Sequence, residues 1–284
     1  MKKSLIGFVT LLIVVTITSA HAQEREEYGY NSNSLRPIRN SDQLFKKTLW
    51  WLIDLREKQN KPFLAKNTEI TKVIIEAVTQ GILRPFVNDS LKTRLSYDDF
   101  MKKITREAAN DGLTEEEKAL GFGVEDDAGG WGDEFSSDNS SASNLPDRYL
   151  PRDFYLIELK EDLIFDKKRS RMYHDIQAIT IILPADKNTK GVDIPIASFM
   201  YKELVENAFK DHPDAIWFNN ANPKEHRNFA EAFDLRLFAG HLVKYSNSED
   251  ASIEEIYGGQ REAMYAALQI EYALLDFETQ LWEY

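Results

Sequence analysis

Two nine-residue stretches, 104 positions apart, have nearly the same pattern and constrain the fold more than any other feature of the chain. Residues 50–58 read WWLIDLREK and residues 154–162 read FYLIELKED. Both run aromatic, aromatic, Leu, Ile, acid, Leu, base, Glu, so two strands with these sequences would present the same pattern on each face. A duplicated structural unit, a duplicated binding site and chance all account for such a repeat. The matched faces favour two equivalent strands, which indicates architecture and not catalysis.

The composition changes sharply over residues 121–150, which are acidic and rich in Gly and Ser. Such a segment buries too little apolar surface to offset the entropy lost on ordering. It also lacks the Asp/Asn spacing of a calcium loop. We therefore predict an acidic disordered linker between two α/β-mixed halves, 44–120 and 151–284, after a flexible arm over 23–43. The expected fold class is α+β, in which each half has a small sheet and packing helices.

Apolar spacing predicts the elements of both halves. The first half has a β-prone run over 44–55, a helical pattern that ends at Gly81 and a second helix after Ser96. The second half has strand patterns over 154–165, 172–183 and 192–201, each bounded by turn residues. A further helix is expected to begin at Pro223, and it would carry apolar or aromatic side chains at steps of four residues, namely Phe229, Phe233, Leu237 and His241.

The longest predicted helix covers residues 260–284 and has apolar residues on more than one side. One stripe contains Ala263, Ala267, Ile270, Leu274, Phe277 and Leu281, and a second contains Met264, Leu268, Leu275 and Trp282. An apolar arc this wide exceeds what a helix lying on one surface needs. Either the helix is sandwiched inside its own domain, or part of it is kept for another subunit.

The first residues predict a secretory leader over 1–22. A basic start is followed by an uncharged apolar run over 5–17 and by small residues before Gln23. The chain has no cysteine, so a lipid cannot be attached behind this leader, and disulfides and thiolate metal sites are excluded. The formal charge of −12 argues against a nucleic-acid partner or direct adsorption to anionic lipid. No second long apolar run predicts a membrane span.

Motifs for catalysis are absent from the sequence. The five His do not form a zinc-binding pattern, and no nucleophile elbow, P-loop or dinucleotide-binding motif is present. Adjacent acids such as Glu254 and Glu255 point apart on a helix, so they cannot act as a pair across a glycosidic bond. We assign no catalytic, cofactor-binding or metal-ligating residue and predict that the protein is not an enzyme.

Long stretches of the chain resemble a known family. The runs LWWLIDLREKQNKPF, NTEITKVIIEAVTQGILRPFVNDSL, KEDLIFDKKRS and FETQLWEY are similar to the gliding-motility family GldN, called PorN in relatives that do not glide. The resemblance extends from about residue 44 to the C-terminus, apart from the acidic linker. One departure is that a basic pair is expected after the first Trp, where this chain has Trp51 and Leu52. A partner contact made by that pair in relatives would here be apolar or lie elsewhere.

The resemblance implies a periplasmic component of the type IX protein secretion and gliding motility machinery. Members assemble with an outer-membrane lipoprotein of the GldK/PorK type into a large ring, next to the inner-membrane-anchored GldM/PorM and GldL components. The implied role is a structural scaffold that is held at the outer membrane by its lipidated partner. The periplasmic part of GldM/PorM and neighbouring copies in the ring are further implied contacts.

The candidate partner interface consists of apolar residues that a single domain does not obviously need: Trp50, Trp51, Met264, Leu268, Leu275 and Trp282. Trp282 is the expected anchor, because a ring near a chain end frays unless something covers it. Packing of Trp282 on its own domain is the alternative. A periplasmic glycan- or peptide-binding module, in which tryptophans stack on a ligand, is the second functional hypothesis, and a periplasmic hydrolase is the third.

Overall fold

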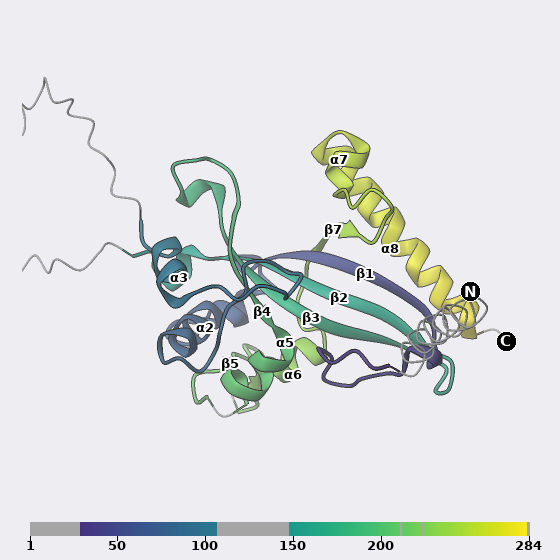
Figure 1. Ribbon diagram of the computed structural model, residues 1–284, viewed down its shortest axis with the longest axis horizontal. Coiled ribbons are helices and arrows are strands. Elements are labelled where there is room, and N and C mark those ends of the chain that lie inside the picture. Colours follow the sequence, from purple (N-terminus) through teal and green to yellow (C-terminus); the bar gives the residue numbers. More distant parts are fainter. Residues whose placement is uncertain (1–28, 107–147, 211, 223, 283–284) are drawn as a thin grey trace, which may run out of the picture.

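A five-stranded antiparallel sheet forms the centre of the computed structural model, which describes residues 29–106, 148–210, 212–222 and 224–282 (Figure 1). The strand order is β4–β3–β2–β1–β7. Together with the helices on the sheet, this order confirms the α+β class. Four of the strands were predicted, with ends that differ from the observed ones by at most two residues: β1 (Gln43–Asp54), β2 (Leu156–Asp166), β3 (Arg171–Leu183) and β4 (Ile194–Met200). The fifth strand, β7 (His241–Tyr245), was not predicted.

The two repeated stretches pair with each other at the centre of this sheet. β1 and β2 run antiparallel, and Ile53 lies opposite Ile157, its own equivalent in the repeat. Trp51 lies opposite Leu159. Their equivalents in the repeat, Tyr155 and Leu55, also pair, because the Leu55 backbone N–H donates to the Tyr155 carbonyl at 2.8 Å. The repeat is therefore a local two-fold arrangement of neighbouring strands. The sequence predicted one sheet in each half, whereas the structure joins strands from both sides of residues 107–147 in a single sheet.

The helices are short except for the last, and several have clear end signals. Ser96 caps α3 by accepting from the Asp99 backbone N–H at 3.1 Å, and Gly81 follows α2 with a left-handed φ of +74° that few other residues adopt. The helices are α2 (Ile70–Thr79), α3 (Tyr97–Lys103), α5 (Tyr201–Glu203) with a following π-helical turn (Leu204–Phe209), α6 (Phe229–Asp234), α7 (Ile253–Tyr257) and α8 (Gln260–Trp282). Short 3-10 turns lie at Asn40–Asp42, Lys61–Leu64, Pro151–Asp153 and Ala185–Lys187, and β5 (Ile216–Trp217) pairs with β6 (Arg227–Asn228).

The larger hydrophobic cluster packs helices α2, α3, α5 and α6 against one end of the sheet. Ile53 of β1 and Phe199 of β4 are both fully buried in it. Phe63, in the connection after β1, stacks on Phe229 of α6 with ring centroids 5.8 Å apart. Aromatic and branched side chains from both sides of residues 107–147 therefore share one core.

The smaller hydrophobic cluster lies at the other end of the sheet, below α7 and α8. In Figure 1, α8 runs beside β7 and reaches one end of β1. Leu49, Leu163, Leu242, Ile253, Ala266 and Ala267 are its buried members. Phe45 of β1 and Phe277 of α8 extend it, with ring centroids 4.7 Å apart. The long C-terminal helix was correctly predicted up to Trp282, and residues 283–284 lie outside the described part.

The helix predicted from Pro223 to His241 forms only over Phe229–Asp234, because Arg227–Asn228 before it is strand β6 and the chain after it is not helical. α6 ends at Asp234, and His241 begins β7 instead. The chain reverses at Arg236, whose φ is +52°, and Gly240 then passes the β1 backbone so closely that a Cβ there would meet the Leu52 carbonyl oxygen at 3.2 Å. The i, i+4 spacing was thus misleading, because pairing with β1 stabilises residues 241–245 as a strand.

The described part of the N-terminal arm, residues 29–42, is fixed to β3 by polar side chains. Asn31 donates to Gln177 at 2.8 Å, and the buried Ser34 donates to Asp175 at 2.8 Å. These contacts lie along the part of β3 that β4 does not pair with, since β4 reaches only Ala178. The predicted leader and nearly all of the predicted linker lie outside the described residues.

Candidate docking surface

Trp50 and Trp51 lie on opposite faces of β1, and each donates its indole N–H to a carboxylate of the same chain. Trp50 is 9% exposed, and its Nε1 donates to Asp89 Oδ2 at 2.9 Å. Lys160 Nζ lies 5.1 Å from the centre of its ring. Burial would raise the pKa of Asp89, but the hydrogen bond from Trp50 and the charge of Lys160 hold that pKa below its ordinary value. Trp50 therefore offers little surface to a partner.

Trp51 belongs to a polar row between the two hydrophobic clusters, which we define as Trp51, Glu161, His174 and Arg236. Its Nε1 donates to Glu161 Oε1 at 2.7 Å, and Arg236 donates to the other carboxylate oxygen at 2.5 Å. His174 Nδ1 lies 3.2 Å from Glu161 Oε1. Burial acting alone would raise the pKa of Glu161, whose side chain is fully buried, but the hydrogen bond with His174 and the charge of Arg236 lower it. This carboxylate is held ionised by structural partners.

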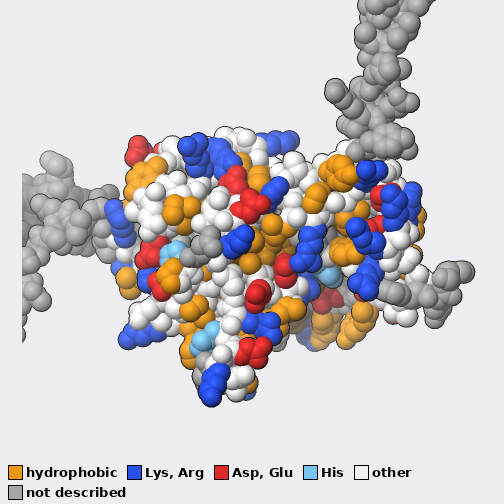
Figure 2. All heavy atoms as spheres, turned by 90° about the horizontal axis from the view of Figure 1, so that it is seen from below, with side chains coloured by type: hydrophobic (Ala, Val, Ile, Leu, Met, Phe, Trp, Pro, Cys, Tyr) orange, Lys and Arg blue, Asp and Glu red, His pale blue; other side chains and the backbone are white. Residues whose placement is uncertain are grey.

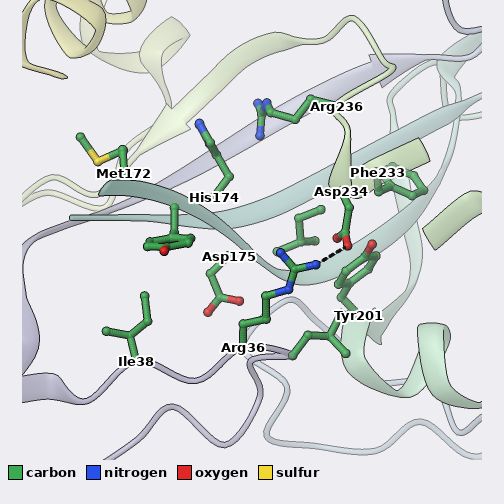
Figure 3. A pocket seen from close by; sticks show the side chains of 12 residues that line it. Arg36, Ile38, Met172, His174, Asp175, Tyr201, Phe233, Asp234 and Arg236 are labelled. Atoms are coloured by element: carbon green, nitrogen blue, oxygen red, sulfur yellow. Dashed lines mark hydrogen bonds and ion pairs between the residues drawn. The ribbon is translucent and has the colours of Figure 1, made fainter. Parts of the chain in front are cut away.

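A cavity of about 240 Å³ lies beside this row, between the arm and β3 (Figure 3). Arg36 of the arm crosses it and pairs with Asp234 at 3.1 Å, while His174 and Arg236 line the same cavity. Both members of the Arg36–Asp234 pair are largely exposed, so this ion pair contributes little to stability. The cavity marks the place where the arm closes over the free edge of β3.

The two apolar stripes of α8 differ in how far they are exposed. The inner seam, which we define as Ala263, Ala267, Ile270, Leu274, Phe277 and Leu281, is buried or half-buried, and most of its members pack against the smaller cluster or the Phe45 ring. The outer side of the helix is uncovered: Met264 is 54% exposed, Leu268 45% and Leu275 58%. The structure therefore places three of the six candidate interface residues together on one solvent-facing surface.

Two tyrosines that the sequence reasoning missed complete this surface. Tyr265 is 54% exposed and Tyr272 is 66% exposed. We define the outer seam as Tyr265, Leu268, Tyr272 and Leu275, with Met264 beside it. Counting tyrosine as an apolar residue at helical spacing would have found both. Trp282 is the last described position of α8, and its side chain lies outside the described part.

A groove of about 510 Å³ runs between α8 and strand β7 at the edge of the sheet. Met264 and Leu268 line one wall of this groove, and Leu242 and Val243 line the other. Glu271 lines the same groove beside the Leu242 backbone, and burial raises the pKa of this carboxyl group. The apolar surface of α8 thus continues into a hollow next to a strand edge.

We also searched the described residues for a charged surface, a metal-binding group and a membrane-spanning helix. The face in Figure 2 mixes Lys and Arg, Asp and Glu, and apolar side chains without a field of one charge. No three His, Asp or Glu side chains in the described ranges converge into a metal-binding group. None of the described helices combines the length and the hydropathy needed to cross a membrane.

Comparison with protein-family models shows the family to which the chain belongs. The family model for gliding motility associated protein GldN matches residues 38–283. The chain belongs to the GldN family. A comparison with curated proteins gave no match.

The GldN match extends over the described sheet and its helices and includes α8 with both of its seams. It begins at Ile38, at the end of the arm, and continues beyond the last described residue. The family is a component of gliding motility and type IX secretion. The candidate surface therefore lies within the part of the chain that the GldN family model matches.

Proposed function

We propose that this GldN-family protein is a non-enzymatic periplasmic scaffold subunit of the type IX secretion and gliding machinery. It forms a ring complex with an outer-membrane lipoprotein of the GldK/PorK type, and its activity consists of contacts and not of bond chemistry. The observation that carries the proposal is the family match together with the uncovered outer side of α8. An apolar helix face of this extent is typical of a protein-binding surface.

The predicted leader and the absence of cysteine support the location. Export with cleavage after Ala22 delivers a chain with no site for its own lipid. Attachment to the outer membrane then comes from the lipidated partner. Mass measurement of the mature protein tests this step: we expect Gln23 as the first residue and no acyl chain, and a retained leader or an attached lipid would contradict it.

The contacts of Trp50 and Trp51 argue against the alternative function as a glycan-binding module. That alternative depended on Trp50 and Trp51, whose indole N–H groups are both engaged by carboxylates within the chain. Trp50 is nearly buried, and Trp51 packs against both hydrophobic clusters. These rings stabilise the sheet and are poorly placed to stack on a sugar.

Purification of the untagged assembly from detergent-treated envelopes tests the proposed function. We expect the chain to sediment as a large complex together with a lipidated protein, and a Leu268→Ala, Leu275→Ala variant to leave that complex while remaining folded. The matched control is Leu235→Ala, which truncates an exposed leucine after α6. A chain recovered only as a monomer in the soluble periplasmic extract would overturn the proposal.

A further inference from the structure

The outer seam of α8 has the spacing of a coiled coil. Tyr265, Leu268, Tyr272 and Leu275 follow one another at steps of three, four and three residues. This is the alternation by which one helix keeps a continuous contact with another as both supercoil. All four side chains are at least 45% exposed. A contact line of this regularity is therefore unoccupied along the middle of the helix.

The inner seam repeats the same spacing on the opposite side. It follows steps of four and three residues from Ala263 to Leu281, and Ile270 in its middle lies two positions before Tyr272 and two positions after Leu268. Two positions correspond to roughly 200° around a helix, so the seams point away from each other. The inner seam packs on the sheet through contacts such as that of Phe277 with Phe45. α8 is thus built as the middle layer of three, and the described chain supplies only two of these layers.

The residues that flank the outer seam carry negative charge. In the register of a coiled coil the flanking positions are Glu262, Met264, Gln269, Glu271, Asp276 and Glu278. None of the four acidic side chains forms an ion pair with a residue that the structure describes. Flanking charges select the partner of a coiled coil, because opposite charges attract across the contact line and like charges repel.

These charges disfavour a second copy of α8 as the occupant. An antiparallel pair would place Glu262 of one copy close to Asp276 of the other and would bring the two Glu271 side chains together. A parallel pair would place Glu271 beside Asp276. Both arrangements set carboxylates against carboxylates, so the outer seam requires a different partner.

We propose that the outer seam of α8 binds an amphipathic helix of another protein, whose apolar heptad seam is flanked by Lys and Arg. The incoming apolar residues cover the four seam side chains, and its basic residues pair with the acidic flanks of α8. The groove between Met264, Leu268 and β7 takes the larger side chains at one end of the contact. This inference rests on the proposed role of α8 as an assembly surface and adds the chemistry of the partner.

Synthetic peptides of about four heptads test the proposal on the full mature protein. One peptide has a Leu/Ile seam with Lys at both flanks, and the second has the same seam with Glu at the flanks; the like charges keep each peptide from pairing with itself. Fluorescence anisotropy should show binding of the basic-flanked peptide alone. Circular dichroism should show that the peptide gains helix on binding.

Variants of α8 make the outcome specific. Leu268→Ala with Leu275→Ala should weaken binding by about tenfold or more, since two apolar anchors are lost. Leu235→Ala should bind like the wild type. Asp276→Lys with Glu278→Lys should remove the preference for the basic-flanked peptide, because the flanks then carry two acids and two lysines. Lys near the end of a helix also suits its dipole.

Equal binding of both peptides, or binding that survives Leu268→Ala with Leu275→Ala, would overturn the proposal. Binding without a gain of helix would point to strand addition at β7 and would overturn it as well. Self-association of the wild-type chain that is lost in the Leu268→Ala, Leu275→Ala variant would show that a second copy is the occupant. A chain that enters the envelope complex but binds no basic helix contradicts this inference alone, whereas a chain outside any complex contradicts the proposed function.

Discussion

The two hydrophobic clusters lie on the same face of one sheet but differ in how they are filled. Leu49, Trp51 and Ile53 alternate along β1 on that face; Leu49 belongs to the smaller cluster, Ile53 to the larger, and Trp51 touches both. The larger cluster contains fully buried Phe and Ile side chains under four helices. The smaller has only six buried members, two of which are alanines of α8, and the other residues that α8 contributes to it are half-buried.

This difference indicates two roles. The larger cluster removes enough apolar surface from water to stabilise the chain, whereas the smaller mainly positions α8 on the sheet. Alanines in the first part of the inner seam let the helix lie close to the strands. The four large side chains of the outer seam are exposed to solvent. One end of the sheet therefore stabilises the protein and the other holds α8 with its outer side exposed, and four measurements test this difference.

The largest effect is expected in the larger cluster. Phe229 is fully buried and contacts two other aromatic rings, so Phe229→Ala should lower the free energy of unfolding by about 3–5 kcal/mol. Leu274→Ala, in the half-buried inner seam, should cost only about 1–2 kcal/mol. Urea denaturation of both variants compares the two ends. Equal losses would show that the clusters contribute alike and would remove the contrast.

The polar row between the clusters should give the next largest effect. Glu161→Gln keeps the shape and the contact with Trp51 but leaves Arg236 without its buried counter-charge, and we expect a loss of about 2 kcal/mol. Asp234→Asn, which breaks the exposed pair with Arg36, is the matched control and should cost less than about 0.5 kcal/mol. Similar losses in both variants would mean that burial of Glu161 has no special weight.

The pH dependence of the free energy of unfolding measures the contribution of Glu161, the carboxylate of the polar row. The pKa of Glu161 is lower in the folded chain than its ordinary value, so its stabilisation is complete above about pH 4.3 and is lost as the pH falls through the folded pKa. Unfolding of the wild type measured from pH 7 downward should therefore show a steeper acid-side loss than unfolding of Glu161→Gln. Parallel curves would show that Glu161 is not held ionised by the fold.

The smallest effect on stability is expected at the outer seam. Tyr272→Ala and Leu275→Ala remove side chains that are mostly in water, so the free energy of unfolding should change by no more than about 0.5 kcal/mol. The same variants should weaken assembly with the partner. Losses of unfolding free energy close to that of Leu274→Ala would show that the outer seam belongs to the core and is not a binding surface.

Much of the fold could be predicted because the strands have clear local signals. The repeated stretches and the apolar runs over 172–183 and 192–201 gave the correct strands, and their shared face pattern was a sound reason to treat β1 and β2 as equivalents. Their mutual pairing was not predicted, since strand partners depend on long-range contacts. β7 was missed for the same reason, because five residues of mixed polarity become a strand only by pairing with β1.

The candidate site was predicted in part. Helical spacing placed Met264, Leu268 and Leu275 on one side of the last helix, and the structure shows that side in contact with solvent. Trp50 and Trp51 were chosen for their type alone, and their engagement by Asp89 and Glu161 could not be foreseen. Glu161 contacts Trp51, 110 positions before it, and Arg236, 75 positions after it, so no local sequence pattern predicts the polar row.

The pairing of the repeated stretches also has a consequence for the order in which the chain folds. β1 has only β2 and β7 as strand neighbours among the described residues, and both follow it by more than a hundred positions. During synthesis β1 therefore leaves the ribosome before either of its partner strands. Both of its hydrogen-bonding edges stay unpaired until most of the polypeptide has been made. Non-local pairing of this kind slows folding and exposes the early chain to aggregation. Nascent or exported chains that end before Leu156 should thus depend on a holding chaperone, whereas chains that include β2 and β3 can close the central pair themselves.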